Sequence, residues 1–445
     1  MLLNAFSGAV DIVSDDVVDR VARGHRLPLE PTVPDDAALL DRGYYVQSHA
    51  HEDGAARLVA RHAKRAALAS PDIKYMFALT LRCNLACDYC WQVIEQRVER
   101  QKTGLMSEEI VDAAFAFIDR DMTQRGKTNA FISLFGGEPL IDTPAMHALV
   151  RAIGDRAAAR GQHLHFTTNG RQLGAYRDEI RRYRPSMQIT VDGIAHDAVD
   201  GGLVLTRAGQ PLTGLWPLLA ELAREGAASG IFLRFLVAPD TVDPFVALAD
   251  AVFADEAVAA GISLGCAPLQ NKAARIDPAI PEKFQILDQL ARALEDRAYS
   301  PRIAYIDWRS LNLFNDLRVG DDTLPTPVFF HCEANVDLTC FDQDGRLYAC
   351  YEAIGDAKLS VGRFWPEVAI DRDHLAEYRD RSAFAIPQCS QCALSPICGG
   401  GCEVRGQKRN GAYALPYCDD LHAETALVMR NWERMTKLLA GTSHG

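Results

Sequence analysis

Short apolar runs alternate with segments of helical pattern from Lys74 to about residue 257. The apolar runs cover 75–81, 131–135, 164–166, 187–191 and 231–237, and the helical segments cover 107–122, 145–161, 218–230 and 244–257. Apolar runs that are each followed by an amphipathic helix build parallel strands with crossover helices, so an α/β fold is expected. Ser107 is expected to cap the first helix, with Glu108 and Glu109 in its first turn.

The loop after the first apolar run carries three closely spaced cysteines, Cys83, Cys87 and Cys90. Three thiolates on one loop can ligate three corners of a cubane iron-sulfur cluster and leave the fourth iron open to a reactant. Zinc is the competing metal, but a structural zinc site needs four protein ligands. His51 and His62 precede the loop without metal-like spacing, so the loop favours an iron-sulfur cluster.

Three further motifs follow apolar runs: Phe-Gly-Gly-Glu-Pro at 135–139, Thr-Thr-Asn-Gly at 167–170 and Ile-Thr-Val-Asp-Gly at 189–193. The loops after the carboxyl ends of parallel strands gather at one face, where active sites lie. These motifs are therefore expected to share one rim with the cysteine loop. Each of them, taken alone, also suits an ordinary turn.

A second array of cysteines occupies the C-terminal part, where the strand and helix alternation stops. Its members are Cys332, Cys340, Cys350, Cys389, Cys392, Cys398, Cys402 and Cys418, with Gly345 ahead of Cys350. A zinc ribbon on the four cysteines from Cys389 to Cys402 is the alternative to iron-sulfur clusters. Cys266 has no partner at metal-ligand spacing and is expected to be a buried structural thiol.

Composition and charge restrict the possible partners of this chain of 445 residues. Its formal net charge of -12 and the absence of a long Lys/Arg run argue against a nucleic-acid partner. No apolar stretch reaches the length of a membrane helix, and the first residues lack a basic signal-peptide region. A cytoplasmic protein without membrane partner is expected, whose 12 cysteines serve as metal thiolates rather than disulfides.

Taken together, the cysteine loop, the three motifs and the C-terminal array resemble radical S-adenosylmethionine (SAM) enzymes with a C-terminal SPASM extension. The resemblance implies a partial (β/α)6 barrel over 71–300 and a SPASM domain over 301–445. Residues 1–70 read as a small N-terminal α+β module. That module is expected either to bind the leader of a precursor peptide or to decorate the barrel.

The resemblance also implies the cofactors, SAM and three 4Fe-4S clusters. Cys83, Cys87 and Cys90 would hold the SAM-binding cluster. One auxiliary cluster would lie on Cys332, Cys350 and Cys402, with Cys340 as the favoured fourth ligand, and another on Cys389, Cys392, Cys398 and Cys418. The implied SAM contacts are Tyr89, Gly136, Gly137, Glu138, Thr168, Asn169 and Arg234, although Arg234 equally suits a salt bridge.

For function, the resemblance implies an oxidoreductase whose 5′-deoxyadenosyl radical abstracts hydrogen from a ribosomally synthesised precursor peptide. A carbon-carbon or thioether cross-link would result, with flavodoxin or ferredoxin as electron donor. Asp192, Tyr351 and Glu352 are the candidate catalytic residues. Tyr351 stands where anaerobic sulfatase maturases carry a catalytic Asp, which disfavours formylglycine formation.

Three functions remain as alternatives to the peptide cross-linking enzyme. One is a sulfatase-maturase-like enzyme, and another is a small-molecule radical SAM dehydrogenase. The third, an iron-sulfur electron-transfer or peptide-binding protein, would not need the motifs that face SAM.

Overall fold

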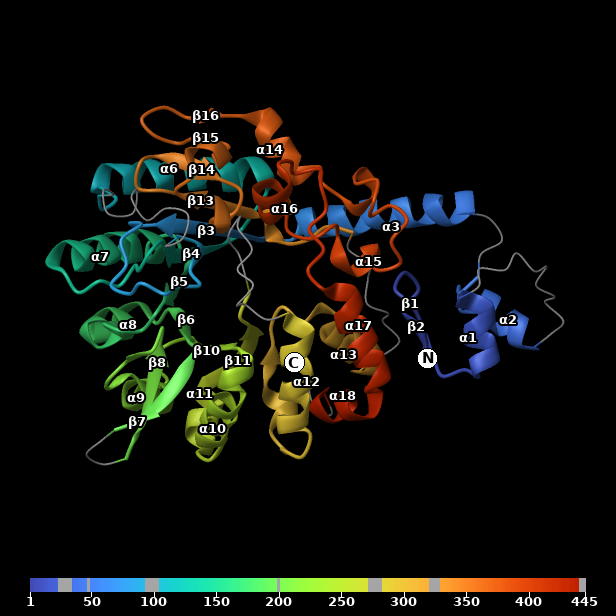
Figure 1. Ribbon diagram of the computed structural model, residues 1–445. Helices are drawn as coiled ribbons and strands as arrows, with labels where there is room; N and C mark the ends of the chain where they lie inside the picture. Colours follow the sequence, from blue (N-terminus) through green and yellow to red (C-terminus); the bar gives the residue numbers. More distant parts are fainter. Residues whose placement is uncertain are drawn as a thin grey trace.

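The computed structural model describes residues 1–22, 34–45, 49–92, 104–197, 201–270, 282–319 and 329–439. Its centre is an eleven-stranded sheet (Figure 1). In spatial order the strands are β12 (Ala304–Tyr305), β11 (Ile262–Pro268), β10 (Gly230–Val237), β6 (Ser186–Val191), β5 (His163–Thr168), β4 (Asn129–Phe135), β3 (Asp72–Ala78), β13 (Leu338–Phe341), β14 (Arg346–Tyr348), β15 (Gly362–Arg363) and β16 (Ala369–Ile370).

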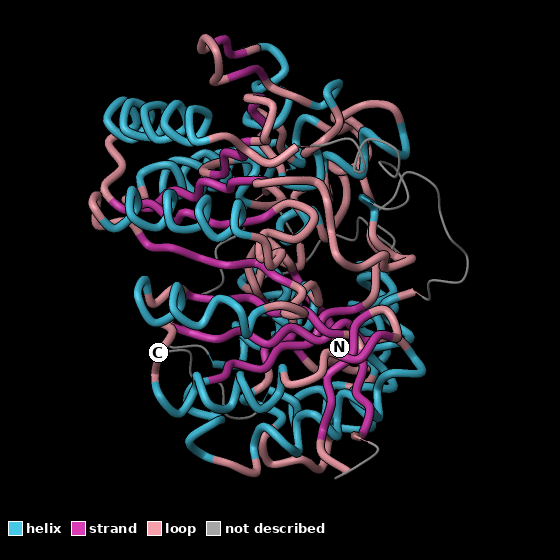
Figure 2. The backbone as a smooth tube through the Cα atoms, turned by 90° about the vertical axis from the view of Figure 1, so that its left-hand side faces the viewer, coloured by secondary structure: helices cyan, strands magenta, loops and turns pink. Residues whose placement is uncertain are grey.

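The strands from β3 to β12 are parallel neighbours in chain order. Figure 2 shows them as a curved stack with helices running alongside. The helices of this part are α6 (Glu108–Arg125), α7 (Pro144–Ala158), α8 (Arg177–Tyr183), α9 (Leu215–Glu225), α10 (Val242–Phe253), α11 (Glu256–Gly261) and α12 (Lys283–Leu294), with the 3-10 turns η1 (Leu173–Tyr176), η2 (Pro239–Thr241) and η3 (Ser300–Arg302). The predicted α/β architecture is confirmed.

Local chemistry sets the helix ends that the sequence predicts. Ser107 is the N-cap of α6, and its Oγ accepts a hydrogen bond from the backbone N–H of Ile110 at 3.3 Å. Gly126 ends the same helix in the left-handed region at φ 66°, where glycine meets no steric penalty. Between β6 and α9, a small antiparallel sheet is inserted: β7 (Gly193–His196), β8 (Leu203–Arg207) and β9 (Gln210–Pro211).

The C-terminal part continues the barrel sheet. Strand β13 pairs in parallel with β3, from Leu338 beside Lys74 to Phe341 beside Phe77, and β14 turns back antiparallel. The predicted boundary at residue 300 lies inside η3, ahead of a strand that still belongs to this sheet. The remaining elements are α13 (Arg309–Val319), η4 (Glu333–Asn335), η5 (Tyr351–Ala353), η6 (Ala357–Leu359), α14 (Arg372–Arg379), η7 (Ala383–Ala385), α15 (Ser395–Cys398), α16 (Glu403–Asn410), α17 (Leu421–Arg430) and α18 (Trp432–Leu439).

The run of glycines between Cys398 and Cys402 has a steric cause. Gly399, Gly400 and Gly401 all have positive φ, and a Cβ on Gly401 would lie 1.8 Å from the carbonyl oxygen of Tyr417. The guanidinium of Arg381 donates to the carbonyls of Gly400 and Gly401 at 2.8 and 2.7 Å. Only glycine fits this turn, which places its two flanking cysteines.

Within its described residues, the N-terminal module contains a hairpin and three helices. These are β1 (Leu2–Asn4), β2 (Ala9–Asp11), α1 (Asp15–Ala22), α2 (Pro34–Asp41) and α3 (His49–Ala69). Leu2, Val17 and Leu39 form a small core of its own. Ala5 packs with Leu394 and Leu421, so the hairpin contacts the C-terminal cysteine region.

In the part of the chain that the structure describes, no helix has the length and apolar character needed to cross a membrane.

Candidate functional site

A cavity of about 720 Å³ lies along the inner face of the barrel sheet. Its wall includes the three cysteines of the first loop together with both glycines and the glutamate of the Phe-Gly-Gly-Glu-Pro motif. Thr168 and Asn169 line it from the end of β5, Thr190 from β6 and Arg234 from β10. The structure therefore brings the predicted motifs together around one space.

Backbone and amide groups surround the thiols of the cysteine loop. The N–H of Leu85 donates to Cys83 Sγ at 3.4 Å, and Asn169 Nδ2 approaches the same sulfur at 3.7 Å. Asn169 Nδ2 also donates to Asn84 Oδ1 at 2.8 Å. Donors directed at a ligating sulfur stabilise the thiolate and tune the potential of a cluster.

The two glycines of the motif are required by the approach of one loop to another. A Cβ on Gly136 would lie 2.2 Å from the carbonyl oxygen of Thr80, and one on Gly137 would lie 2.2 Å from that of Arg82. The N–H of Gly137 donates to Thr80 O, and that of Glu138 donates to Arg82 O, both at 2.8 Å. The motif is thereby fixed directly to the segment that leads into Cys83.

Glu138 links this motif to the end of β5. Its buried carboxylate accepts from Thr168 Oγ1 at 2.6 Å, from Asn169 N at 2.8 Å and from Leu140 N at 3.0 Å. Burial raises the pKa of Glu138, whereas these three hydrogen bonds oppose the rise. The contact between Glu138 and Thr168 thus fixes the loop at 135–139 to the loop at 167–170.

Asp192 and Tyr89 connect the cysteine loop to the inserted hairpin. Tyr89 donates to Asp192 Oδ2 at 2.5 Å, and the N–H of Ala208 donates to the same oxygen at 2.7 Å. Tyr89 lines the cavity, whereas Asp192 lies outside its lining. The structure therefore places Asp192 between Tyr89 and the hairpin, and its catalytic role stays a prediction.

Arg207, on β8 of the hairpin, is a cation beside the cysteine loop. It donates to Thr190 O at 2.7 Å and is hydrogen-bonded to Cys87. Burial lowers the pKa of Arg207, but Tyr89, Cys87 and Asp192 together raise it above its ordinary value. The guanidinium therefore stays charged next to a thiol that a cluster would ligate.

Arg234 lies across the cavity, where NH2 donates to Asp307 at 3.0 Å. The Nε atoms of Arg207 and Arg234 are both buried without a hydrogen-bond partner. Tyr351 lines the cavity and packs edge-on against Phe135, with ring centroids 5.6 Å apart. The next residue, Glu352, does not line the cavity.

Glu352 is held by a bidentate ion pair. Arg405 Nε and NH2 donate to its two carboxylate oxygens at 3.1 and 3.0 Å. The Glu352 side chain is buried, and the same arginine also reaches Gln270 at 3.0 Å. A carboxylate fixed in this way anchors the loop after Cys350, and the catalytic role of Glu352 stays a prediction.

Cys332, Cys350 and Cys402 form one thiol group in the C-terminal part. Each is the N-cap of a helical segment: η4, η5 and α16 respectively. Burial raises the pKa of Cys350 well above its usual range, and Cys402 and Cys332 raise it further. Burial also raises the pKa of Cys402 to about 12. These thiols are close enough to repel one another's charge.

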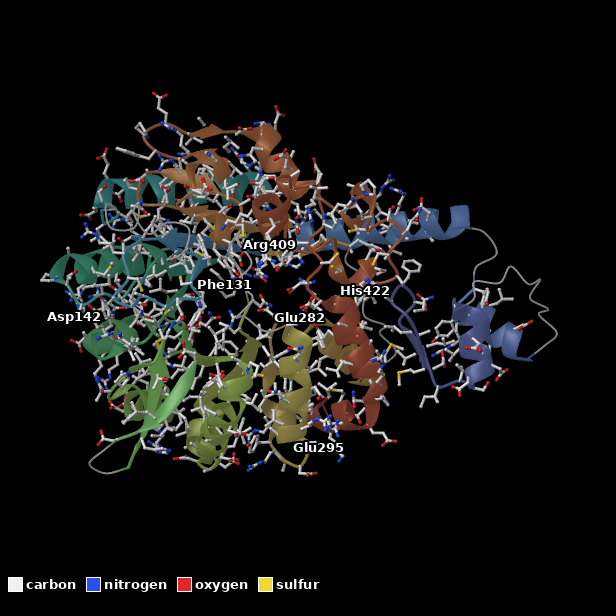
Figure 3. All side chains as sticks on the ribbon, in the orientation of Figure 1. Phe131, Asp142, Glu282, Glu295, Arg409 and His422 are labelled. Atoms are coloured by element: carbon white, nitrogen blue, oxygen red, sulfur yellow. The ribbon has the colours of Figure 1, made fainter. Side chains whose placement is uncertain are left out.

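Cys389, Cys392, Cys398 and Cys418 form the other group. Burial raises the pKa of Cys389 to about 11, and the remaining three cysteines contribute to the rise. His422, labelled on α17 in Figure 3, lies with Nε2 3.4 Å from Cys392 Sγ. The two groups divide the array as the family resemblance implies.

Cys340 lies apart from both groups, fully buried in β13 beside Met76. Burial raises its pKa, and its charged neighbours are Lys74, Glu333 and Arg379 rather than other cysteines. The structure does not bring it to the three thiols that it was predicted to complete. Cys266 is fully buried in β11, as expected for a structural thiol.

The residues present fit the implied cofactors. All 12 cysteines are free, and three thiols on the cavity wall with N–H donors toward one of them suit a cluster. The unpartnered Nε atoms of the two cavity arginines suit a carboxylate such as that of SAM. Among the described side chains, no group of three or more His, Cys, Asp and Glu is arranged to hold a single metal ion.

The sequence did not single out Arg207, Arg405 or Glu403. Arg207 is 120 residues from Cys87, in a hairpin whose pairing has no local signal. Glu403 and Arg405 follow Cys402, just after the run of glycines, and their charge next to a cysteine motif was the available signal.

Residues 77–246 match the Radical SAM superfamily. Two curated GTP 3′,8-cyclases are 34% and 32% identical over 104 residues, from Rhizobium etli (strain CIAT 652) and Rhizobium leguminosarum bv. trifolii (strain WSM2304). The matched segment is 23% of this chain and 27% of each cyclase. The chain therefore spans about a quarter of the length of these curated relatives.

Two solved structures share the fold over most of the chain. Native anSMEcpe with bound AdoMet and Cp18Cys peptide has a TM-score of 0.58 at 13% identity, covering 83% of this chain and 99% of its own. Streptococcus suis SuiB bound to precursor peptide SuiA has a TM-score of 0.54 at 13% identity, covering 90% and 86%. The predicted resemblance to radical SAM enzymes and the predicted fold class are confirmed.

Proposed function

We propose that this radical SAM protein is a peptide maturase that installs a carbon-carbon or thioether cross-link in a ribosomally synthesised precursor. The supporting observation is the cavity of about 720 Å³, where the cysteine loop meets the Gly-Gly-Glu and Thr-Asn segments and the C-terminal Tyr351. When bound, an iron-sulfur cluster and SAM supply hydrogen abstraction from an unactivated carbon, which acid-base side chains cannot perform.

The chain's own residues orient and shield that chemistry. Leu85 and Asn169 direct N–H groups at Cys83, while Arg207 places positive charge beside Cys87. Glu138 ties the two SAM-facing loops together. Tyr351, packed on Phe135, adds an aromatic surface to the cavity wall.

Two features of the N-terminal module support a peptide substrate. Its β1–β2 hairpin forms a two-stranded sheet, and an extended peptide binds such an edge by adding a strand. Ile12, directly after β2, is 82% exposed and offers an apolar contact there. The same module packs on the Cys389 group through Ala5 and Leu394, and SuiB was solved with a precursor peptide.

The proposal includes three 4Fe-4S clusters, one on the first loop and two on the C-terminal groups. The auxiliary clusters would carry the electron that remains after hydrogen abstraction and bond formation, and a flavodoxin or ferredoxin would supply the initiating electron. The 12 free thiols would be preserved in a reducing cytoplasm.

Co-expression with a candidate precursor, followed by mass spectrometry, tests the proposed activity. A loss of two hydrogens, with fragmentation absent between two residues, is the expected result for a cross-link. Oxidation of one residue with normal fragmentation would instead support sulfatase-type chemistry, and SAM cleavage on a free metabolite would support the small-molecule dehydrogenase.

Substitution of Ile12 tests the leader-binding part separately. Ile12→Asp is expected to weaken precursor binding about tenfold, since a charge replaces an exposed apolar contact. Leu58→Asp, at another exposed apolar residue (56% exposed, on α3), is the matched control. Equal precursor affinity of the two variants would contradict leader binding at the hairpin.

A further inference from the structure

One buried carboxylate beside the thiol group of Cys332, Cys350 and Cys402 lacks a full set of partners. Glu403 follows Cys402 directly, opens α16 and is 0% exposed. Its Oε1 lies 3.9 Å from Cys332 Sγ, and its Oε2 is buried without a hydrogen-bond partner. Its surroundings also contain the charges of Cys350 and Cys402, whose pKa values it helps to raise after burial.

The neighbouring cations do not form an ion pair with the carboxylate of Glu403. The guanidinium of Arg381 is used by backbone carbonyls, including those of Gly400 and Gly401. Lys64 Nζ donates to the carbonyl of Asn335. Among the described residues, no ion pair includes Glu403, although Arg381 and Lys64 both interact electrostatically with its carboxylate.

Glu352 shows how the same region satisfies a buried carboxylate when the role is structural. Both of its oxygens accept from Arg405, at 3.0 and 3.1 Å. A buried carboxylate is paired in this way, coordinates a metal or is neutralised by a proton, because an unpaired charge is costly. Glu403 is as buried as Glu352 but has no ion-pair partner among the described residues, and its Oε1 lies next to the Cys332 thiol, one of the three thiols of this group.

Those three thiols leave one corner of a cubane without a protein ligand. Cys340 does not fill it in this structure, since its charged neighbours are Lys74, Glu333 and Arg379. We propose that Glu403 is the fourth protein ligand of the cluster held by Cys332, Cys350 and Cys402. This inference rests on the proposed function, in which the C-terminal thiols hold iron-sulfur clusters.

A carboxylate ligand gives that corner a distinct chemistry. Thiolates are the soft ligands that iron-sulfur clusters prefer, whereas a carboxylate is a hard oxygen donor. The iron bound to Glu403 is therefore held less tightly than its three neighbours. The cluster keeps four anionic protein ligands, so its net charge equals that of an all-cysteine cluster.

The test uses the full-length chain, reconstituted anaerobically with ⁵⁷Fe, with Cys83, Cys87 and Cys90 replaced by Ala so that only the C-terminal clusters remain. Glu403→Ala and Glu403→Gln are compared with Cys340→Ala by Mössbauer and EPR spectroscopy after mild oxidation. Both Glu403 variants are expected to lose about one iron per chain and to show a three-iron cluster. Glu403→Cys is expected to restore four irons in an all-sulfur environment.

Cys340→Ala is expected to match the parent in iron content and spectra. Loss of the iron in Cys340→Ala would overturn the inference, as would a Glu403→Gln variant that keeps all its iron with unchanged spectra. Circular dichroism identifies a misfolded variant, and the isosteric glutamine keeps the test valid if the alanine variant unfolds. A parent that binds no iron at all would contradict the proposed function itself, a different outcome from either of these.

Discussion

The two cysteine regions of this molecule are assembled in opposite ways. The first loop gathers Cys83, Cys87 and Cys90 within eight residues, on the wall of an open cavity. The group of Cys332, Cys350 and Cys402 draws its members from three helix N-termini spread over 70 residues. Cys350 and Cys402 share a buried interior with Glu352, Glu403 and Arg405, whereas Cys332 is half-buried.

The difference shows that one kind of ligand can be supplied by local or by global structure. A tight loop holds its thiols close together by itself and presents them to a reactant. Residues from other elements need only to contact the loop. A site drawn from distant segments depends on the surrounding fold, and its buried polar neighbours must all be satisfied. Substitution of a loop cysteine should therefore separate activity from folding in the first region, whereas substitutions in the second region should couple them.

The largest effect is expected at Cys83. Cys83→Ala should lower formation of 5′-deoxyadenosine from SAM and dithionite by at least about 10²-fold, since loss of an outer partner alone costs a metal site 10–100-fold. Cys266→Ala, at a buried cysteine outside every thiol group, is the control. Undiminished formation of 5′-deoxyadenosine by Cys83→Ala would show that the thiols of the first region are not needed for the reaction, and would contradict the comparison between the two regions.

Gly401 tests the dependence of the second region on its fold. Gly401→Ala should reduce the free energy of unfolding by about 3 kcal/mol and release iron from the C-terminal groups, because φ is +73° and the Cβ would strike Tyr417. Gly411→Ala, at φ +83° with open space around it, should cost only about 1 kcal/mol. Urea unfolding and iron analysis measure both effects, and equal losses would contradict the steric explanation.

Glu138 probes the partners of the first region. Glu138→Gln should cost about 2 kcal/mol of unfolding free energy, since an amide cannot accept all the hydrogen bonds from Leu140, Thr168 and Asn169. Glu367→Gln, at an exposed glutamate, should change little. A thermal shift no larger in Glu138→Gln than in this control would show that the two loops do not depend on the carboxylate.

The smallest effect concerns His165 in the cavity wall. Burial lowers its pKa to about 4, with further contributions from Lys74 and His163. Between about pH 4 and the ordinary histidine value of 6.5, the unfolded chain binds a proton that the folded chain does not, so stability falls as the pH falls. The lowered pKa of His165 should reduce the free energy of unfolding by about 1 kcal/mol at about pH 5.5.

His165→Gln should flatten this pH dependence of the melting temperature, whereas His62→Gln, at an exposed histidine, should leave it unchanged. Both curves are measured on the metal-free protein. Parallel curves for His165→Gln and the unmodified chain would show that water reaches this side of the cavity.

The sequence predicted the barrel and its cysteine loop because their signals are local. Apolar runs report strands, and the spacing of Cys83, Cys87 and Cys90 fixes three ligands without reference to distant residues. Ser107 was likewise predicted as a helix cap from its neighbours alone, and the structure confirms it.

Contacts between distant segments could not be predicted in this way. Asn169 supports Cys83 across 86 residues, and Arg207 reaches Cys87 from an inserted hairpin. The same limit applies to Cys340. Its proximity to Cys332 in sequence suggested a shared cluster, but the pairing of β13 with β3 places Cys340 in the core. Side-chain roles at the second site depend on which segments the sheet brings together.

The parallel pairing of β13 with β3 joins the two cysteine regions by a hydrogen-bonded ladder. Cys83 follows the end of β3, and Cys350 follows the end of β14, one strand beyond β13. Adjacent strands keep a spacing of about 4.8 Å. The two cysteine regions therefore cannot move apart as separate bodies without breaking the hydrogen bonds between these two strands.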